Sequence, residues 1–102
     1  MDDGGASGAR GPTSRLITLA QNAPNPVQAG TRIGYTLGAS GPVTLAIFDL
    51  QGRRVATLLD HQPQPAGEHS VTFNTAGWPV GCYLYRLDLG SLAFTRKMLL
   101  VR

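Results

Sequence analysis

The stretch from residue 81 to residue 89, GCYLYRLDL, shows the strongest strand pattern in the chain. Tyr83 and Tyr85 share one parity with two leucines, whereas the residues between them are mostly polar. Because successive side chains of a strand point to opposite faces, this alternation predicts a half-buried antiparallel strand. Gly90-Ser91 follows as a turn signal, so we expect residues 92–101 to return as the second strand of a hairpin.

Similar patterns recur along the rest of the chain, separated by Gly- and Pro-rich turn signals. No stretch keeps apolar residues at a helical spacing without interruption. We expect the other strands at residues 15–21, 31–37, 43–49, 54–59 and 68–74, with a polar loop at 60–67. Seven short strands predict an all-β fold, a seven-stranded antiparallel immunoglobulin-like β-sandwich. The expected core residues are Val43, Leu45, Ile47, Val71, Phe73, Tyr83, Tyr85 and Leu87.

The first fourteen residues differ from the rest in composition. Residues 1–14 are rich in Gly, Ser and Asp and contain no apolar residue larger than Ala after Met1. We expect a flexible linker here, or a remnant of a cut from a longer protein, and one domain over residues 15–102. The start has neither a basic region nor an apolar run, so no signal peptide is expected.

The ionisable residues do not form a pattern that indicates chemistry. The net charge is +3, but the arginines are scattered, so nucleic acid is not expected as a partner. His61 and His69 have no carboxylate or thiol at ligand spacing, and Cys82 has no neighbouring base. We therefore expect no metal, no cofactor and no enzymatic activity.

The aromatic residues allow two interpretations. Tyr83 and Tyr85 have the spacing of a sugar-stacking platform, but the same spacing suits a core face, which we favour. Trp78 also allows two interpretations: an exposed binding hot spot, or a cap on an open end of the sandwich. We favour the cap.

The end of the chain, FTRKMLLVR, carries large apolar residues on both parities. Lys97 shares a face with Leu99 and Val101, while Met98 lies on the other face. Either this strand is buried on both faces, or its edge and second face accept a partner by β-augmentation. Since chain ends usually fray, we expect removal of residues 100–102 to leave the domain folded.

The segment NAPNP, residues 22–26, places two prolines two positions apart. Proline cannot occupy a central strand and restricts the residue before it. The segment therefore predicts a stiff loop between strands, with a polyproline ligand motif as the less favoured interpretation.

Six phrases carry a resemblance to a known family. They are LAQNAPNP at 19–26, IGYTL at 33–37, VTLAIFDLQGR at 43–53, GEH at 67–69, GCYLY at 81–85 and RKMLLVR at 96–102. In this order they resemble the C-terminal sorting domain of the type IX secretion system of Gram-negative bacteria. The domain is also similar to the immunoglobulin-like domain of flagellar hook-capping proteins.

The resemblance implies a non-catalytic sorting signal that directs an attached upstream cargo through the periplasm and across the outer membrane to the cell surface or beyond. The implied partners are the outer-membrane secretion machinery and a cell-surface peptidase that cuts in the linker. After the cut, the cargo can be joined to anionic lipopolysaccharide. No small-molecule substrate is implied. The expected sorting-recognition residues are Gly81, Tyr83, Lys97, Leu99, Val101 and Arg102, and the loop motif is Asn22, Pro24, Asn25 and Pro26. The alternatives are a carbohydrate-binding or spacer sandwich of a secreted hydrolase, and a structural assembly domain.

Overall fold

The computed structural model describes residues 17–101, and none of these residues lies in a helix. The strands are β2 (Ile17–Leu19), β3 (Gly30–Leu37), β4 (Gly41–Asp49), β5 (Arg54–Gln64), β6 (Gly67–Asn74), β7 (Gly81–Leu89) and β8 (Leu92–Leu100). Within this part of the chain there is accordingly no helix long and apolar enough to cross a membrane.

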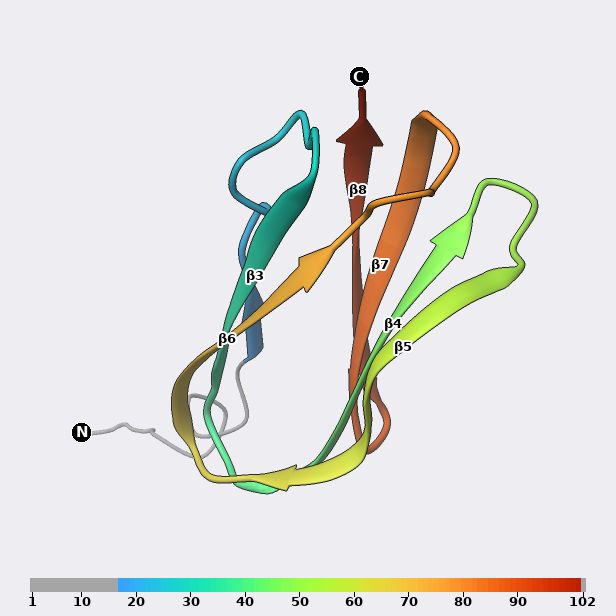
Figure 1. The fold of residues 1–102 in the computed structure, drawn as a ribbon. Helices are drawn as coiled ribbons and strands as arrows, with labels where there is room; N and C mark the ends of the chain where they lie inside the picture. The colour runs from blue at the N-terminus through green and yellow to red at the C-terminus, as the bar shows by residue number, and fades with distance from the viewer. Residues whose placement is uncertain (1–16, 102) are drawn as a thin grey trace.

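The strands form two antiparallel sheets that face each other, as Figure 1 shows. One sheet has the order β2-β3-β6 and the other β5-β4-β7-β8. This arrangement confirms the predicted immunoglobulin-like sandwich. The fourth sandwich strand, β5, pairs with β4 in the larger sheet, whereas constant-type antibody domains place it beside the equivalent of β6.

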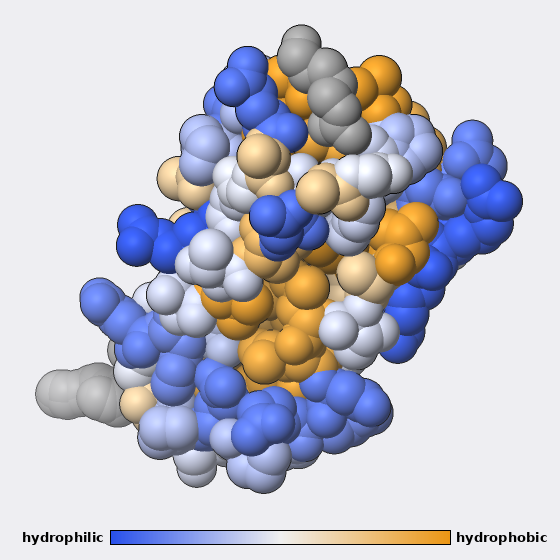
Figure 2. Space-filling view, in the orientation of Figure 1, coloured by the Kyte–Doolittle hydropathy of each residue, from blue (hydrophilic) through white to orange (hydrophobic). Residues whose placement is uncertain are grey.

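The core lies between the sheets and contains all eight residues expected there. Six of them are buried, and Val71 and Phe73 are partly buried against the cluster. Figure 2 shows apolar side chains filling the space between the sheets on the side where β5 and β6 form the edges. The two-residue alternation of each strand therefore identified the inward faces correctly.

The expected loop at residues 60–67 is mostly wrong, because β5 continues to Gln64. His61 has a positive φ of 51° and forms a bulge opposite Thr44, whose hydroxyl accepts a hydrogen bond from the His61 backbone N–H at 3.2 Å. The bulge interrupts the alternation that marks a strand. Pro63 is tolerated because β5 is an edge strand, where one side of the backbone needs no partner.

The remaining boundaries agree closely with the predicted ones. β8 ends at Leu100, one residue before the expected end, and β2 occupies the middle of the expected first strand. The predicted linker at residues 1–14, the start of the first strand at residues 15 and 16, and Arg102 lie outside the described residues.

Candidate recognition site at the end of the last strand

β8 is an edge strand whose two halves differ in burial. Residues 92–97 are exposed, whereas Met98 and Leu100 are 0% and 1% exposed. Met98 lies opposite Tyr83 of β7 and Leu100 lies opposite Gly81. The inward-facing side chains at the end of β8 thus belong to the core. This contradicts our expectation that residues 100–102 are dispensable for folding.

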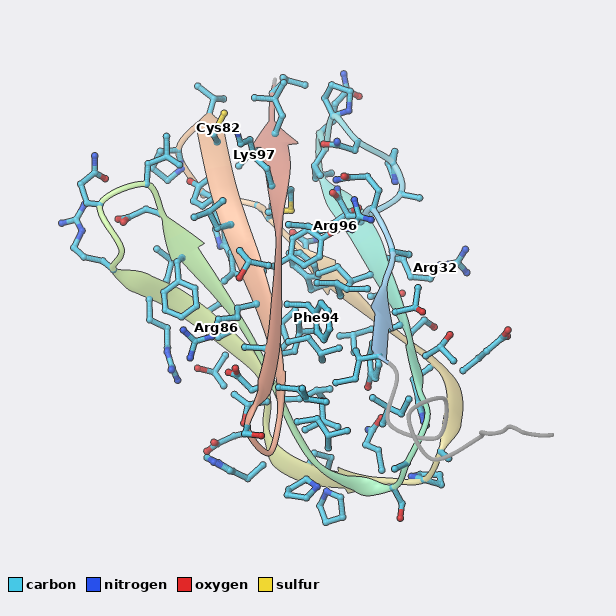
Figure 3. The ribbon with its side chains drawn as sticks, turned by 180° about the vertical axis from the view of Figure 1, so that it is seen from behind. Arg32, Cys82, Arg86, Phe94, Arg96 and Lys97 are labelled. Atoms are coloured by element: carbon cyan, nitrogen blue, oxygen red, sulfur yellow. The ribbon has the colours of Figure 1, made fainter. Side chains whose placement is uncertain are left out.

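The outer face of the same segment remains in water. Lys97 is exposed and Leu99 is 38% exposed, while Val101 is half-buried. Across the strand pair, Leu99 lies opposite Cys82, and Figure 3 shows Lys97 and Cys82 near the same end of the molecule. The interpretation of a terminal strand buried on both faces is therefore wrong.

The free edge of β8 is occupied at this end by the proline loop. The Val27 N–H donates to the Leu99 carbonyl at 2.7 Å, and the Val101 N–H donates to the Val27 carbonyl at 2.8 Å. The Leu99 N–H donates to Asn25 Oδ1 at 3.1 Å, and Gln21 Nε2 donates to the Lys97 carbonyl at 2.8 Å. An added strand needs these backbone groups, so β-augmentation along residues 97–101 is excluded in this structure.

A buried polar network holds the proline loop against the core. Asn22 is 2% exposed, and its Nδ2 donates to the Pro24 carbonyl at 3.0 Å and to Thr31 Oγ1 at 3.1 Å. Its backbone N–H donates to the Tyr85 hydroxyl at 2.9 Å, and that hydroxyl donates to the Ala20 carbonyl at 2.7 Å. Burial raises the pKa of Tyr85, so the hydroxyl stays protonated and remains a donor.

Val27 is the apolar anchor of the loop and is 0% exposed. Ala23 exchanges two backbone hydrogen bonds of 2.9 Å with Arg32 of β3, which fixes the start of the loop. Pro24 and Pro26 are exposed, and both follow cis peptide bonds. We call residues 21–27 together with residues 97–101 the terminal clasp.

The terminal clasp brings together most of the residues expected to act in recognition. Lys97, Leu99 and Val101 lie beside the loop motif, and β7 places Gly81 and Tyr83 next to them. Tyr83 is buried and its hydroxyl donates to the Pro79 carbonyl at 2.5 Å, so it supports the site without presenting a surface.

Sequence reasoning missed the residues that close the clasp from the loop side. The predicted loop motif stopped before Val27, although an apolar residue directly after a polar proline loop is a signal for an anchor. Gln21 and Thr31 carried no such signal. Arg96 was also missed: its Nε donates to the Leu19 carbonyl at 2.5 Å and ties β8 to β2 (Figure 3).

The aromatic residues are used inside the fold. Tyr83 and Tyr85 are buried, which confirms their interpretation as core residues. Trp78 is partly buried, and its ring lies 6.1 Å from Phe73 and 5.5 Å from Tyr83, as expected for a cap. The sugar-stacking platform considered for the two tyrosines is therefore not available on the surface.

Both histidine side chains contact other groups of the protein, and the ring of His69 stacks on that of Tyr35 with the centroids 5.3 Å apart. His61 Nδ1 lies 2.9 Å from Asp60 Oδ1 on the surface, and His69 Nε2 lies 2.8 Å from the Pro65 carbonyl. Among residues 17–101, no three His, Cys, Asp or Glu side chains gather in a way that could hold a metal ion.

The fold and the clasp together define a class of protein, an immunoglobulin-like module whose last strand is held by a loop from the start of the domain. Residues 23–101 match the family described as the secretion system C-terminal sorting domain, and the chain belongs to this family. It is a sorting signal domain for type IX secretion of a cargo protein. The family is not catalytic, and membership implies an attached cargo, contact with the secretion machinery and transit to the cell surface or extracellular space. Comparison with curated proteins gave no match.

Proposed function

We propose that the secretion machinery reads the outer face of the terminal clasp, and that this contact carries the cargo from the periplasm across the outer membrane. The observation that supports this is the contrast within three residues of β8. Met98 and Leu100 are fixed in the core, while Leu99 between them is 38% exposed. The side chains of Lys97 and Leu99 are thus displayed on a backbone that is held from two sides.

A fixed backbone favours recognition because little conformational entropy is lost when a partner binds. The loop hydrogen bonds at the Lys97 carbonyl and at both backbone groups of Leu99 hold the strand in place. An exposed Lys contributes little to folding, so Lys97 is more useful for contact than for stability. The displayed pair combines one cation with one apolar side chain.

The finer features of the pathway follow as part of the same proposal. Residues 15–102 act as the sorting unit, residues 1–14 act as a linker that a cell-surface peptidase cuts, and the released cargo is joined to anionic lipopolysaccharide. Arg102, which lies outside the described residues, is included as a contact residue of the same proposal, and the loop motif of residues 22–26 acts by holding the strand. The domain itself catalyses no reaction and binds neither nucleic acid nor a small-molecule substrate.

The test fuses the chain to a secreted reporter in a bacterium with a type IX system and measures reporter at the cell surface. Lys97→Ala and Leu99→Asp should each lower export by about tenfold or more, the loss expected when a central contact is removed. Their thermal midpoints should stay within about 4 °C of the unmodified chain, since both side chains are exposed.

Arg32→Ala is the matched control, because Arg32 is also an exposed cation but lies on β3 of the other sheet. Figure 3 shows its side chain pointing away from β8. This variant should export normally. Normal export of both clasp variants, or an equal loss with Arg32→Ala, would contradict recognition through the clasp.

A further inference from the structure

A second surface lies at the same end of the molecule, between the β4–β5 turn and the β6–β7 loop (Figure 1). Three apolar side chains border an open hollow of about 600 Å³ there: Leu50, Val55 and Val80, which are 60%, 42% and 58% exposed. Gly81 and Tyr83, both expected from the sequence to act in recognition, line the same hollow. Hydrophobic residues gather at this upper end in Figure 2.

The turn that carries Leu50 does not need an apolar side chain there. Asp49 Oδ1 accepts the backbone N–H of Gln51 at 3.0 Å and that of Arg53 at 2.9 Å, and the Gly52 N–H donates to the Asp49 carbonyl at 3.0 Å. Gly52 has φ 85°, a conformation that glycine adopts without strain. The turn is thus held by Asp49 and Gly52, and Leu50 is displayed to water.

The loop that carries Val80 is fixed in a similar way. The Pro79 carbonyl accepts the Tyr83 hydroxyl, and Gly81 has φ 143°, which side-chain-bearing residues rarely adopt. Val80 lies between these two constraints and makes no contribution to the core cluster. Two loops thirty residues apart therefore each present a bulky apolar side chain to one hollow, which marks an interaction surface better than a single exposed residue does.

The charges around the hollow indicate what it would accept. Arg53 Nε lies 2.9 Å from Asp49 Oδ2, so these two lining charges compensate each other. Hydrogen bonds from the Arg53 backbone and side chain hold the pKa of Asp49 below its ordinary value, which keeps the pair ionised. Arg54 also lines the hollow, with its guanidinium 5.5 Å from the Phe48 ring, and leaves a net positive charge.

A groove at the opposite end of the sandwich provides a comparison. Leu92 and Phe94 are 39% and 40% exposed there, and together with Ile17 and Pro42 they line a groove of similar size. None of the residues that line this groove is ionisable. Of these two sites, the hollow is the one that combines exposed apolar side chains with a cation, so it is the one of the two that offers charge complementarity to an acidic partner.

We propose that the hollow bordered by Leu50, Val55 and Val80 is a docking site for a loop of the secretion machinery in which a bulky apolar side chain is flanked by carboxylates. The apolar side chain would fill the hollow and a carboxylate would face Arg54. This inference rests on the proposed sorting function and adds a second contact, separate from Lys97 and Leu99.

The first experiment uses the reporter fusion and compares the two ends of the sandwich. The double variant Leu50→Asp/Val80→Asp should lower surface reporter by about tenfold or more, because it places acidic groups where an acidic partner docks. Leu92→Asp/Phe94→Asp should export within about twofold of the unmodified chain. Thermal midpoints are measured for both, and Leu50→Ser/Val80→Ser replaces the acidic variant if its midpoint falls by more than about 4 °C.

The second experiment is independent of export. The full chain is titrated with the peptide acetyl-Asp-Leu-Phe-Asp-amide, followed by backbone amide NMR shifts, and with acetyl-Lys-Leu-Phe-Lys-amide as the charge-reversed control. The acidic peptide should shift the amides of Leu50, Val80 and Gly81 at lower concentration than the basic one, and Arg54→Glu should reverse this preference.

The outcomes separate the two proposals. If the unmodified chain does not export the reporter, the sorting function itself fails. If the unmodified chain exports, but the hollow variants also export normally or the groove variants lose export equally, only the docking site is overturned. Equal NMR shifts with both peptides, or shifts confined to the groove around Leu92, also overturn it, as does a chain that self-associates through the hollow.

Discussion

The two halves of β8 have the same sequence alternation and the same partner strand, but their inward-facing side chains differ in burial. Leu92 and Phe94 have the parity that faces the core, yet they are 39% and 40% exposed, whereas Met98 and Leu100 with the same parity are 0% and 1% exposed. The second half is covered by the proline loop, with Val27 packed into the core. Parity therefore decides which way a side chain points, and the covering element decides whether it is buried.

The largest loss of stability should follow replacement of Tyr85, which joins the core to the clasp. Tyr85→Ala should lower the free energy of unfolding by about 3–5 kcal/mol, because it removes a fully buried aromatic ring. Tyr85→Phe should cost about 1–3 kcal/mol, since it leaves the Asn22 N–H and the Ala20 carbonyl without a buried partner. Chemical denaturation measures both. A loss below about 1 kcal/mol for the alanine variant would show that the covering loop does not depend on this residue.

Paired truncations in the two halves of β8 test the comparison directly. Leu100→Ala should cost about 2–5 kcal/mol, as removal of a buried leucine side chain does, and deletion of residues 100–102 should cost at least as much. Leu92→Ala should cost less than about 1 kcal/mol, because its side chain is already partly in water. Equal losses at the two positions would mean that burial of β8 does not depend on the loop.

The smallest effect should come from opening the clasp at one hydrogen bond. Asn25→Ala removes the acceptor of the Leu99 N–H and should cost about 1 kcal/mol. Amide exchange at Leu99 should become faster, while exchange at Met98, whose N–H faces β7, should change only with global stability. Unchanged exchange at Leu99 would indicate that water replaces Asn25 without loss.

Alternation along single strands predicted the sandwich well, because each strand is short and one face is buried. Tyr83, Tyr85 and Leu87 lie where the pattern placed them. The extension of β5 was not predictable in this way, since the bulge at His61 breaks the period on which the prediction depends.

The site was only partly predictable, for a different reason. Lys97 and Asn25 were both singled out, but nothing local shows that residue 25 contacts residue 99. The exposure of Leu50 and Val80 was equally unpredictable from the sequence, because apolar residues in turns show no periodicity that indicates which way they point.

The bridge between Val27 and Leu100 has a consequence for the order of events during secretion. Residues near the start of the domain are held by residues near its end, so the clasp cannot close until the whole segment between them has emerged. A polypeptide released N-terminus first would display the recognition face only after the last strand has arrived. A partner that binds this face would therefore bind only a domain whose last strand is present. Cargo attached to a domain truncated before residue 97 would not be recognised.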